Sequence, residues 1–342
     1  MMNYTRNNAR NNARNNAINK TIKRKKYIKK KSKRSQYTGG KKYKNKKPIK
    51  KSEMGSNSNE NKLVCSSANV NQKTYSCYND NEIEKIKNYW NARHPDAKIE
   101  SNDSRVVWEE LKKHMANSCN SEACWLKQNF MNVKDSKEIA SYAFAPNAPS
   151  SWQKNIHQWL SSVDINKVMK QYEKYHKNFE FLGPSPIDFD TYVNDKECVW
   201  DDICNFNLQK LIQRGKTKIG FIFNTDNHFN SGSHWISLFI NVKKNYIFFF
   251  DSNGTTAPKE IKTLVQRIKL QAEEMKIKLE YKENCPNRHQ RKNTECGVYS
   301  LYLIIELVTE RKEPMFFISN SIKDDDINEY RRKYFNVDIL EH

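Results

Sequence analysis

Apolar residues run almost without a break through three short segments in the second half of the chain. Runs of this length are typical of strands that are covered on both faces of a sheet, so we expect strands at 218–224, 235–242 and 246–250. A fourth apolar run, from Val298 to Val308, is too long for a strand and predicts a buried helix. This half of the chain is therefore expected to combine buried strands with helices.

One further helix and one further strand complete this pattern. Apolar side chains between Ile261 and Ala272 recur at helical spacing, and Pro258 stands where that helix would begin. A short strand is expected near 277–281. Together these elements predict an α+β domain over residues 191–342.

Residues 63–190 show mainly the spacing of helices. Behind Asp80, which we expect to be an N-cap, apolar and aromatic side chains fall at helical spacing as far as Trp90. A second helix is expected to begin at Ser104, and prolines interrupt the end of the region. We predict a helical N-terminal module, or arm, ahead of the α+β domain.

Residues 1–62 are predicted to be disordered, because repeats of Asn-Asn-Ala-Arg, blocks of Lys and Arg, and a Ser/Asn-rich stretch leave little apolar surface to bury. Of the 60 Lys and Arg residues, 20 fall in residues 1–52, which contain no Asp or Glu. The other 40 nearly balance the 39 acidic residues, so the net charge of +21 belongs almost wholly to this tail. Two interpretations stay open: nucleic-acid binding or nuclear targeting, and a solvated tail that binds DNA, RNA or other polyanions without selectivity.

The chain gives no sign of secretion or of a membrane span. No apolar run approaches the roughly 20 residues that cross a bilayer, and the basic N-terminus lacks the apolar segment of a signal peptide. The eight cysteines are therefore expected to be reduced, which suits a catalytic thiol.

The candidate chemistry begins with a Cys-Gly pair, Cys296 and Gly297, at the mouth of the buried helix. A thiol at a helix N-terminus meets the positive end of the peptide dipoles, which favours the nucleophilic thiolate. Gln290 stands six residues upstream, where its amide could donate to an oxyanion. These residue types indicate attack on a carbonyl.

A Cys nucleophile needs a base and a group that orients it. His234 precedes one predicted strand and Asp251 follows the next, so an antiparallel hairpin would make the two side chains neighbours. His289 is a rival base, disfavoured because it adjoins Gln290 too closely to lie on an opposing strand. His228 falls in a polar loop and is expected to be exposed.

The order His, Asp, Gln, Cys resembles the adenain-like cysteine proteases, which include the ubiquitin-like-protein proteases and the adenovirus maturation protease. The nearest resemblance is to the polyprotein proteases of African swine fever virus and of giant DNA viruses. It covers about 218–310 and does not extend to 1–62. The residues that carry it are Phe223-Asn224-Thr225-Asp226, Gly232-Ser233-His234-Trp235, Phe250-Asp251-Ser252-Asn253-Gly254, Arg288-His289-Gln290 and Thr294-Glu295-Cys296-Gly297.

The resemblance implies a central mixed sheet flanked by helices, with Cys296 as nucleophile and His234 as its base. Asp251 would orient the imidazole, where the African swine fever virus branch has Asn, and Gln290 would help to bind the oxyanion. Trp235 would wall a narrow groove for Gly-Gly substrates. Trp200, in Trp200-Asp201-Asp202, resembles a Trp-x-Asp element of that groove.

The chemistry implied needs no cofactor. A zinc site at His114, Cys119 and Cys124 is the main alternative use of the remaining cysteines, and it is disfavoured because no second Cys pair of matching type follows. We therefore predict no metal site, and we expect Cys204 and Cys285 to be packed in the interior.

The resemblance implies a cysteine endopeptidase that cleaves Gly-Gly-x or Gly-x-Gly sites in viral structural polyproteins during virion maturation. Its expected locations are the virion and the host cytoplasm. Two alternatives remain: a protease that deconjugates ubiquitin-like tails, and a nucleic-acid-binding virion protein with a degenerate protease fold. Cleavage of its own tail after Gly40, in Gly39-Gly40, is a further hypothesis, beside the interpretation of the pair as a flexible break.

Overall fold

The computed structural model describes residues 64–69, 73–193 and 197–337 of the chain. The tail predicted to be disordered, residues 1–62, lies outside the described residues, and so does the Gly39-Gly40 pair. Among the helices that are described, none combines the length and the apolar character that a membrane crossing requires.

Four helices in the N-terminal part share a core of their own. They are α1 (Asp80–Arg93), α2 (Ser104–Met115), α3 (Glu122–Trp125) and α4 (Val133–Ala143). The predicted start at Ser104 is confirmed. The predicted cap of α1 is wrong by one residue, because Asn79 is the N-cap and forms a capping box with Glu82. Asp80 lies in the first turn instead, where its charge meets the positive end of the helix.

Six of the eight cysteines form disulfides, so the expectation of reduced cysteines is wrong for these six. The bonded pairs are Cys65–Cys77, Cys119–Cys124 and Cys198–Cys204. Their Cα atoms lie 5.1, 5.4 and 6.4 Å apart, a proximity that spacing in the sequence cannot reveal. The bond between Cys119 and Cys124 also takes both sulfurs out of the zinc site considered above. Cys285 and Cys296 are free thiols.

A six-stranded mixed sheet forms the centre of the fold, in the order β1-β3-β4-β5-β6 with β2 beside one end of β3. Its strands are β1 (Phe179–Phe181), β2 (Ser185–Pro186), β3 (Lys218–Asn224), β4 (Trp235–Asn241), β5 (Tyr246–Phe250) and β6 (Glu280–Glu283). The inner pairs β3–β4 and β4–β5 are antiparallel, whereas β1, β2 and β6 pair in parallel. The predicted strands at 218–224 and 246–250 are confirmed, and the one expected at 277–281 lies a few residues later.

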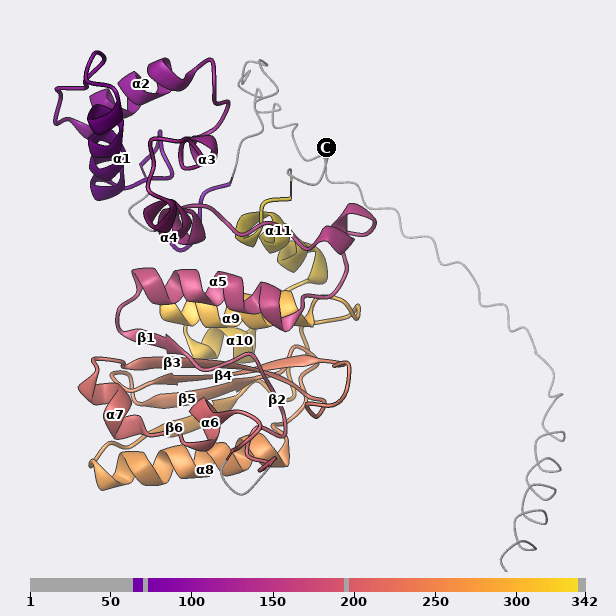
Figure 1. Ribbon diagram of the computed structural model, residues 1–342. Coiled ribbons are helices and arrows are strands. Elements are labelled where there is room, and N and C mark those ends of the chain that lie inside the picture. The colour runs from indigo at the N-terminus through magenta and orange to yellow at the C-terminus, as the bar shows by residue number, and fades with distance from the viewer. Residues whose placement is uncertain (1–63, 70–72, 194–196, 338–342) are drawn as a thin grey trace, which may run out of the picture. The chain divides into compact units, whose positions relative to one another are not determined.

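Helices cover both faces of the sheet, as Figure 1 shows. The helices in this part of the chain are η1 (Ser150–Gln153), α5 (Ser162–Tyr175), α6 (Asp201–Cys204), α7 (Leu208–Gln213), α8 (Lys259–Glu274), α9 (Cys296–Val308), α10 (Pro314–Ser319) and α11 (Asp324–Tyr334), of which α11 packs on α9. Along β4, Phe239 packs toward α5 and α9, while its neighbour Leu238 packs toward α8. Both faces of the inner strands are thus buried, as their unbroken apolar runs predict, and the expected α+β fold is confirmed.

The predicted boundary at residue 190 does not separate two layers of structure. Helix α5 packs against α9 through Ile165, Val168 and Met169, and β1 is hydrogen-bonded to β3. The core shared by α1 to α4 ends near Phe144 instead. The stripe of α5 gives the spacing of a helix but not its partner, which is why sequence alone grouped it with the preceding helices.

Candidate active site

The β4–β5 hairpin brings His234 and Asp251 together. His234 comes directly before β4 and Asp251 directly after β5, and the two strands pair in antiparallel register. The Nε2 atom of His234 lies 2.7 Å from Oδ1 of Asp251. The proximity predicted from the hairpin is therefore confirmed.

A buried asparagine fixes the position of Asp251. Asn284 accepts a hydrogen bond from the Asp251 amide at 2.9 Å and donates from Nδ2 to the Asp251 carbonyl at 2.8 Å. The carboxylate also accepts from the amide of Asn253 at 2.8 Å, at the oxygen that faces the imidazole. Because Asn284 is fully buried, these bonds hold the carboxylate in one place.

Cys296 completes the group at the first residue of α9. Its thiol lies near enough to the His234 ring to raise the pKa of the imidazole. Because Nε2 of His234 faces Asp251, Nδ1 is the ring nitrogen left for the sulfur. Burial lowers the pKa of His234. The hydrogen bonds and charges of Asp251 and Cys296 raise it by a larger amount, so the pKa is about 9. The imidazole is therefore charged at neutral pH and can pair with a thiolate.

Gln290 is held by Ser252, the residue that directly follows Asp251. The Ser252 hydroxyl donates to Oε1 of Gln290 at 2.7 Å, and the Ser252 carbonyl accepts from the Gln290 amide at 2.8 Å. With its carbonyl oxygen engaged, the side-chain amide presents Nε2 as the donor for an oxyanion. Sequence reasoning missed Ser252, although its place directly after Asp251 was a usable signal.

Removing the Ser252 hydroxyl is expected to lower kcat by about 10-fold with little change in KM, because the Gln290 amide would lose the bond that aims it. Steady-state kinetics of Ser252→Ala on a cleavable peptide would measure this. Ser300→Ala is the matched control, since Ser300 is equally buried and its Oγ has no partner among the described residues. Equal kcat values for the two variants would contradict the assignment.

The raised pKa of His234 sets an alkaline limit on activity. The imidazolium persists below pH 9 and is lost above it, so kcat/KM is expected to fall with a midpoint near pH 9. In Asp251→Asn the carboxylate charge is gone, and the midpoint should move down by about one unit or more. A pH profile of kcat/KM for both proteins measures the shift, and an unchanged midpoint would show that Asp251 does not hold the proton.

The two tryptophans expected to bind substrate line one groove of about 840 Å³ beside this site. Trp235 donates from Nε1 to the Leu160 carbonyl at 3.0 Å, which fixes its indole. Trp200 comes directly before α6, and a third indole, Trp159, lines the groove near Leu160. Sequence reasoning missed Trp159 and Leu160, because nothing in the pattern links residues 75 positions apart to the same wall.

The two other histidines considered have different partners. His289 is fully buried, with Nε2 2.9 Å from the Phe317 carbonyl and Nδ1 accepting from the Ile322 amide. Both of its ring nitrogens are engaged, and burial lowers its pKa, so it is a poor base. His228 is exposed, as expected, and its Nδ1 lies 2.7 Å from Asp188.

Three comparisons bear on what this arrangement does. Residues 215–342 match the Ulp1 protease family, C-terminal catalytic domain. A protein of Acanthamoeba polyphaga mimivirus, named as a thiol protease, is 32% identical over 247 residues, which cover 68% of this chain and 75% of the relative. A protein of African swine fever virus, named as a SUMO-1 cysteine protease, is 24% identical over 244 residues, which cover 66% of this chain and 86% of the relative.

The fold is also that of a solved viral protease. The crystal structure of the African swine fever virus protease aligns with a TM-score of 0.55 at 19% identity, over 80% of this chain and 96% of that one. The similarity therefore extends beyond the matched catalytic domain.

Proposed function

The chain belongs to the Ulp1 protease family of cysteine proteases, and we propose that it cleaves viral structural polyproteins after glycine during virion maturation. The observation that carries this proposal is the arrangement of one free thiol, Cys296, with the His234–Asp251 pair on one side. Gln290, held by Ser252, would be the oxyanion donor. The two relatives named above are viral proteins, which supports the virion and the host cytoplasm as its locations.

In this mechanism the Cys296 thiolate attacks the carbonyl carbon of the scissile bond. The oxyanion that forms is stabilised by Nε2 of Gln290 and by the backbone N–H of Cys296 at the start of α9. As the C–N bond breaks, the His234 imidazolium gives its proton to the leaving amine, and an acyl-enzyme remains. The neutral imidazole then takes a proton from water, which attacks the thioester and releases the carboxylate product. The thiolate–imidazolium pair is restored at the end of the cycle.

A preference for glycine before the cleaved bond is supported by the narrow space beside Cys296. Cys296 is only 2% exposed. A Cβ placed on its neighbour Gly297 would lie 3.1 Å from Cβ of Leu160 and 3.3 Å from Cδ1 of Trp235. Leu160 and Trp235 thus form a wall that lies close against the start of α9. A substrate residue with a side chain would need space there that the wall occupies.

Cleavage of a peptide library by wild-type enzyme, with Cys296→Ser as the control, tests the proposal. Mass spectrometry of the products should place glycine before nearly every cleaved bond, and the control should be inert. Cleavage after bulky residues would overturn the glycine specificity. Cleavage that persists in Cys296→Ser would overturn the site.

A second candidate substrate is the tail of a ubiquitin-like protein. The observation in its favour is the name SUMO-1 cysteine protease of the African swine fever virus relative. Both substrates would use the same four residues, so only the substrate distinguishes them. Parallel assays on a ubiquitin-like fusion and on a viral precursor peptide would decide, because the true substrate should have the much larger kcat/KM.

The basic segment 1–52 is proposed to bind DNA or RNA through charge alone. Polypeptide substrates and nucleic acid could then be concentrated in the same particle. The affinity for a random-sequence duplex should fall steeply as salt rises and should vanish when residues 1–52 are deleted. Salt-independent binding would contradict this proposal.

A further inference from the structure

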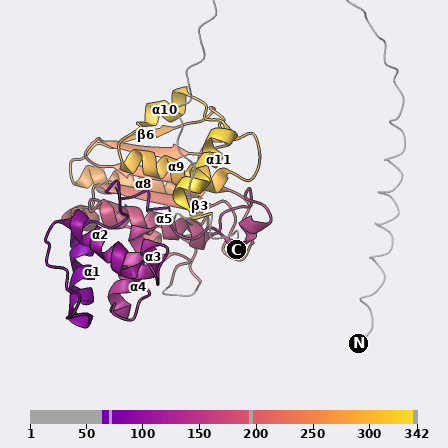
Figure 2. The same cartoon turned by 90° about the horizontal axis from the view of Figure 1, so that it is seen from above.

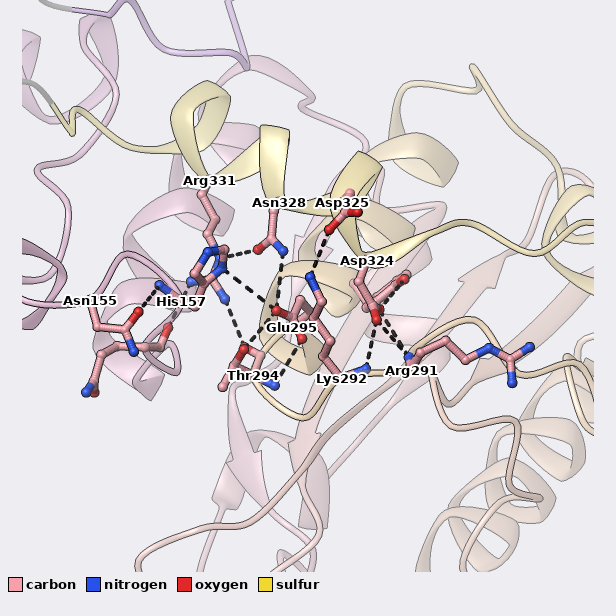
Figure 3. A network of polar contacts seen from close by, with 12 residues as sticks. Asn155, His157, Arg291, Lys292, Thr294, Glu295, Asp324, Asp325, Asn328 and Arg331 are labelled. Carbon is pink, nitrogen blue, oxygen red and sulfur yellow. Dashed lines mark hydrogen bonds and ion pairs between the residues drawn. The ribbon is translucent and has the colours of Figure 1, made fainter.

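Arg331 of α11 is the one arginine with no exposed surface among the described residues. It lies between the segment that leads to Leu160 and the loop that leads to Cys296. Its Nη1 donates to the Gln158 carbonyl at 2.8 Å and its Nη2 to the Thr294 carbonyl at 2.9 Å. Its Nε donates to the Asn328 side chain at 2.8 Å. Figure 3 shows this guanidinium between the segment at Asn155 and the loop that leads to Cys296.

One of the two carbonyls lies close in sequence to the nucleophile, and the other lies close in sequence to Leu160 in the facing wall. Thr294 comes two residues before Cys296, and Gln158 comes two residues before Leu160. Leu160 in turn accepts from the Trp235 indole and lies against Gly297. One planar guanidinium thus connects the nucleophile to the wall that faces it.

Further contacts hold the loop before Cys296 to α11. Asp324 accepts from the backbone amides of Arg291 and Lys292, at 2.9 and 2.8 Å. The fully buried carboxylate of Glu295 accepts from the Thr294 amide at 3.0 Å and from Asn328 at 3.3 Å. The loop is therefore fixed at both ends by one helix.

The charge of Arg331 is kept although it is buried. Burial lowers its pKa to about 10, even though the neighbouring charges of Glu295 and Cys296 raise it. The guanidinium also lies 4.8 Å from the Trp152 ring centroid. At neutral pH it remains a cation, and its planar fork is held on three sides.

We propose that Arg331 is a positioning residue that sets the width of the channel between Cys296 and the Leu160 wall, and thereby the preference for glycine at the cleaved bond. This inference rests on the proposed function. Lysine would keep the charge but could not bridge two carbonyls in fixed geometry. The wall would then move away from the start of α9, and an alanine methyl group could enter.

The experiment compares two peptides that differ only by Gly or Ala before the cleaved bond. In Arg331→Lys we expect kcat for the Gly peptide to fall about 10-fold and the Gly-to-Ala ratio of kcat/KM to fall at least about 10-fold. Arg311→Lys is the matched control, since Arg311 donates from Nε and Nη2 to Oε1 of Glu306, at the other end of α9. Its ratio should equal that of the wild type.

Global destabilisation is tested separately. Ile268→Ala creates a cavity between α8 and the opposite face of the sheet, and it should lower the melting temperature while leaving the ratio unchanged. If Arg331→Lys does not fold, Asn328→Ala is used in its place. It removes one hydrogen-bond partner of Arg331 and should lower the Gly-to-Ala ratio by a smaller factor. A wild-type enzyme without glycine preference would sink the proposed function. A wild-type preference that Arg331→Lys, or Asn328→Ala in its place, fully retains would sink this inference alone.

Discussion

Replacing Cys296 by alanine is expected to lower peptide cleavage by at least about 10⁴-fold, to the limit of detection. The covalent step has no other nucleophile, because the only other free thiol in the described part of the chain, Cys285, is not among the residues around His234. Alanine fits the start of α9 without a clash, so the protein should remain folded. Steady-state hydrolysis and a thermal melt of the same sample would measure both effects.

Cys285→Ala provides the control for this result. The two free thiols should also differ in chemistry, because only Cys296 lies beside an imidazolium. Brief treatment with iodoacetamide should inactivate the wild type and Cys285→Ala alike, with the label at Cys296 in peptide mapping. Loss of activity in Cys285→Ala, or wild-type activity in Cys296→Ala, would refute the assignment.

Replacing His234 by alanine should lower kcat by about 10³ to 10⁴-fold. The change removes both the counter-charge of the thiolate and the proton donor for the leaving amine. Free imidazole can diffuse into the space that is left, so part of the activity should return on adding millimolar imidazole. The same addition should do nothing for Cys296→Ala.

His176→Gln is the control for the loss of a half-buried histidine away from the site. His176 lies at the end of α5, and its Nε2 has no hydrogen-bond partner among the described residues. Its replacement should change activity less than about 3-fold, within the usual range for a position away from the site. If His234→Ala retained near-normal turnover, another group would have to be the base.

The sequence predicts the inner strands well and the outer elements less well. Strands β3 and β5 are buried on both faces, so their apolar runs mark both ends. Strand β6 is an edge strand with no buried residue, and its pattern is correspondingly weak, which explains the shift from 277–281 to Glu280–Glu283. The disulfides were missed because cysteine spacing carries no information on proximity.

The candidate site follows the same division. His234 and Asp251 lie at the two ends of one hairpin, so local pairing alone brings them together. Arg331 and Leu160 reach the site from segments whose contacts depend on the packing of α11 and α5, and no local pattern predicts such contacts. The residues that do the proposed chemistry were thus accessible from the sequence, whereas those that hold them in place were not.

Helix α11 lies beside α9, as Figures 1 and 2 show, yet it follows Cys296 in the chain by nearly thirty residues. On the ribosome the thiol and its base emerge before Asp324 and Arg331, so the loop that carries the thiol cannot be fixed until translation has passed α11. A nascent chain is therefore expected to be inactive as a protease until α11 has been made. Chains ending at residue 320 and stalled through a linker long enough to bring Cys296 out of the ribosome should not cleave a reporter peptide, and chains released in full should.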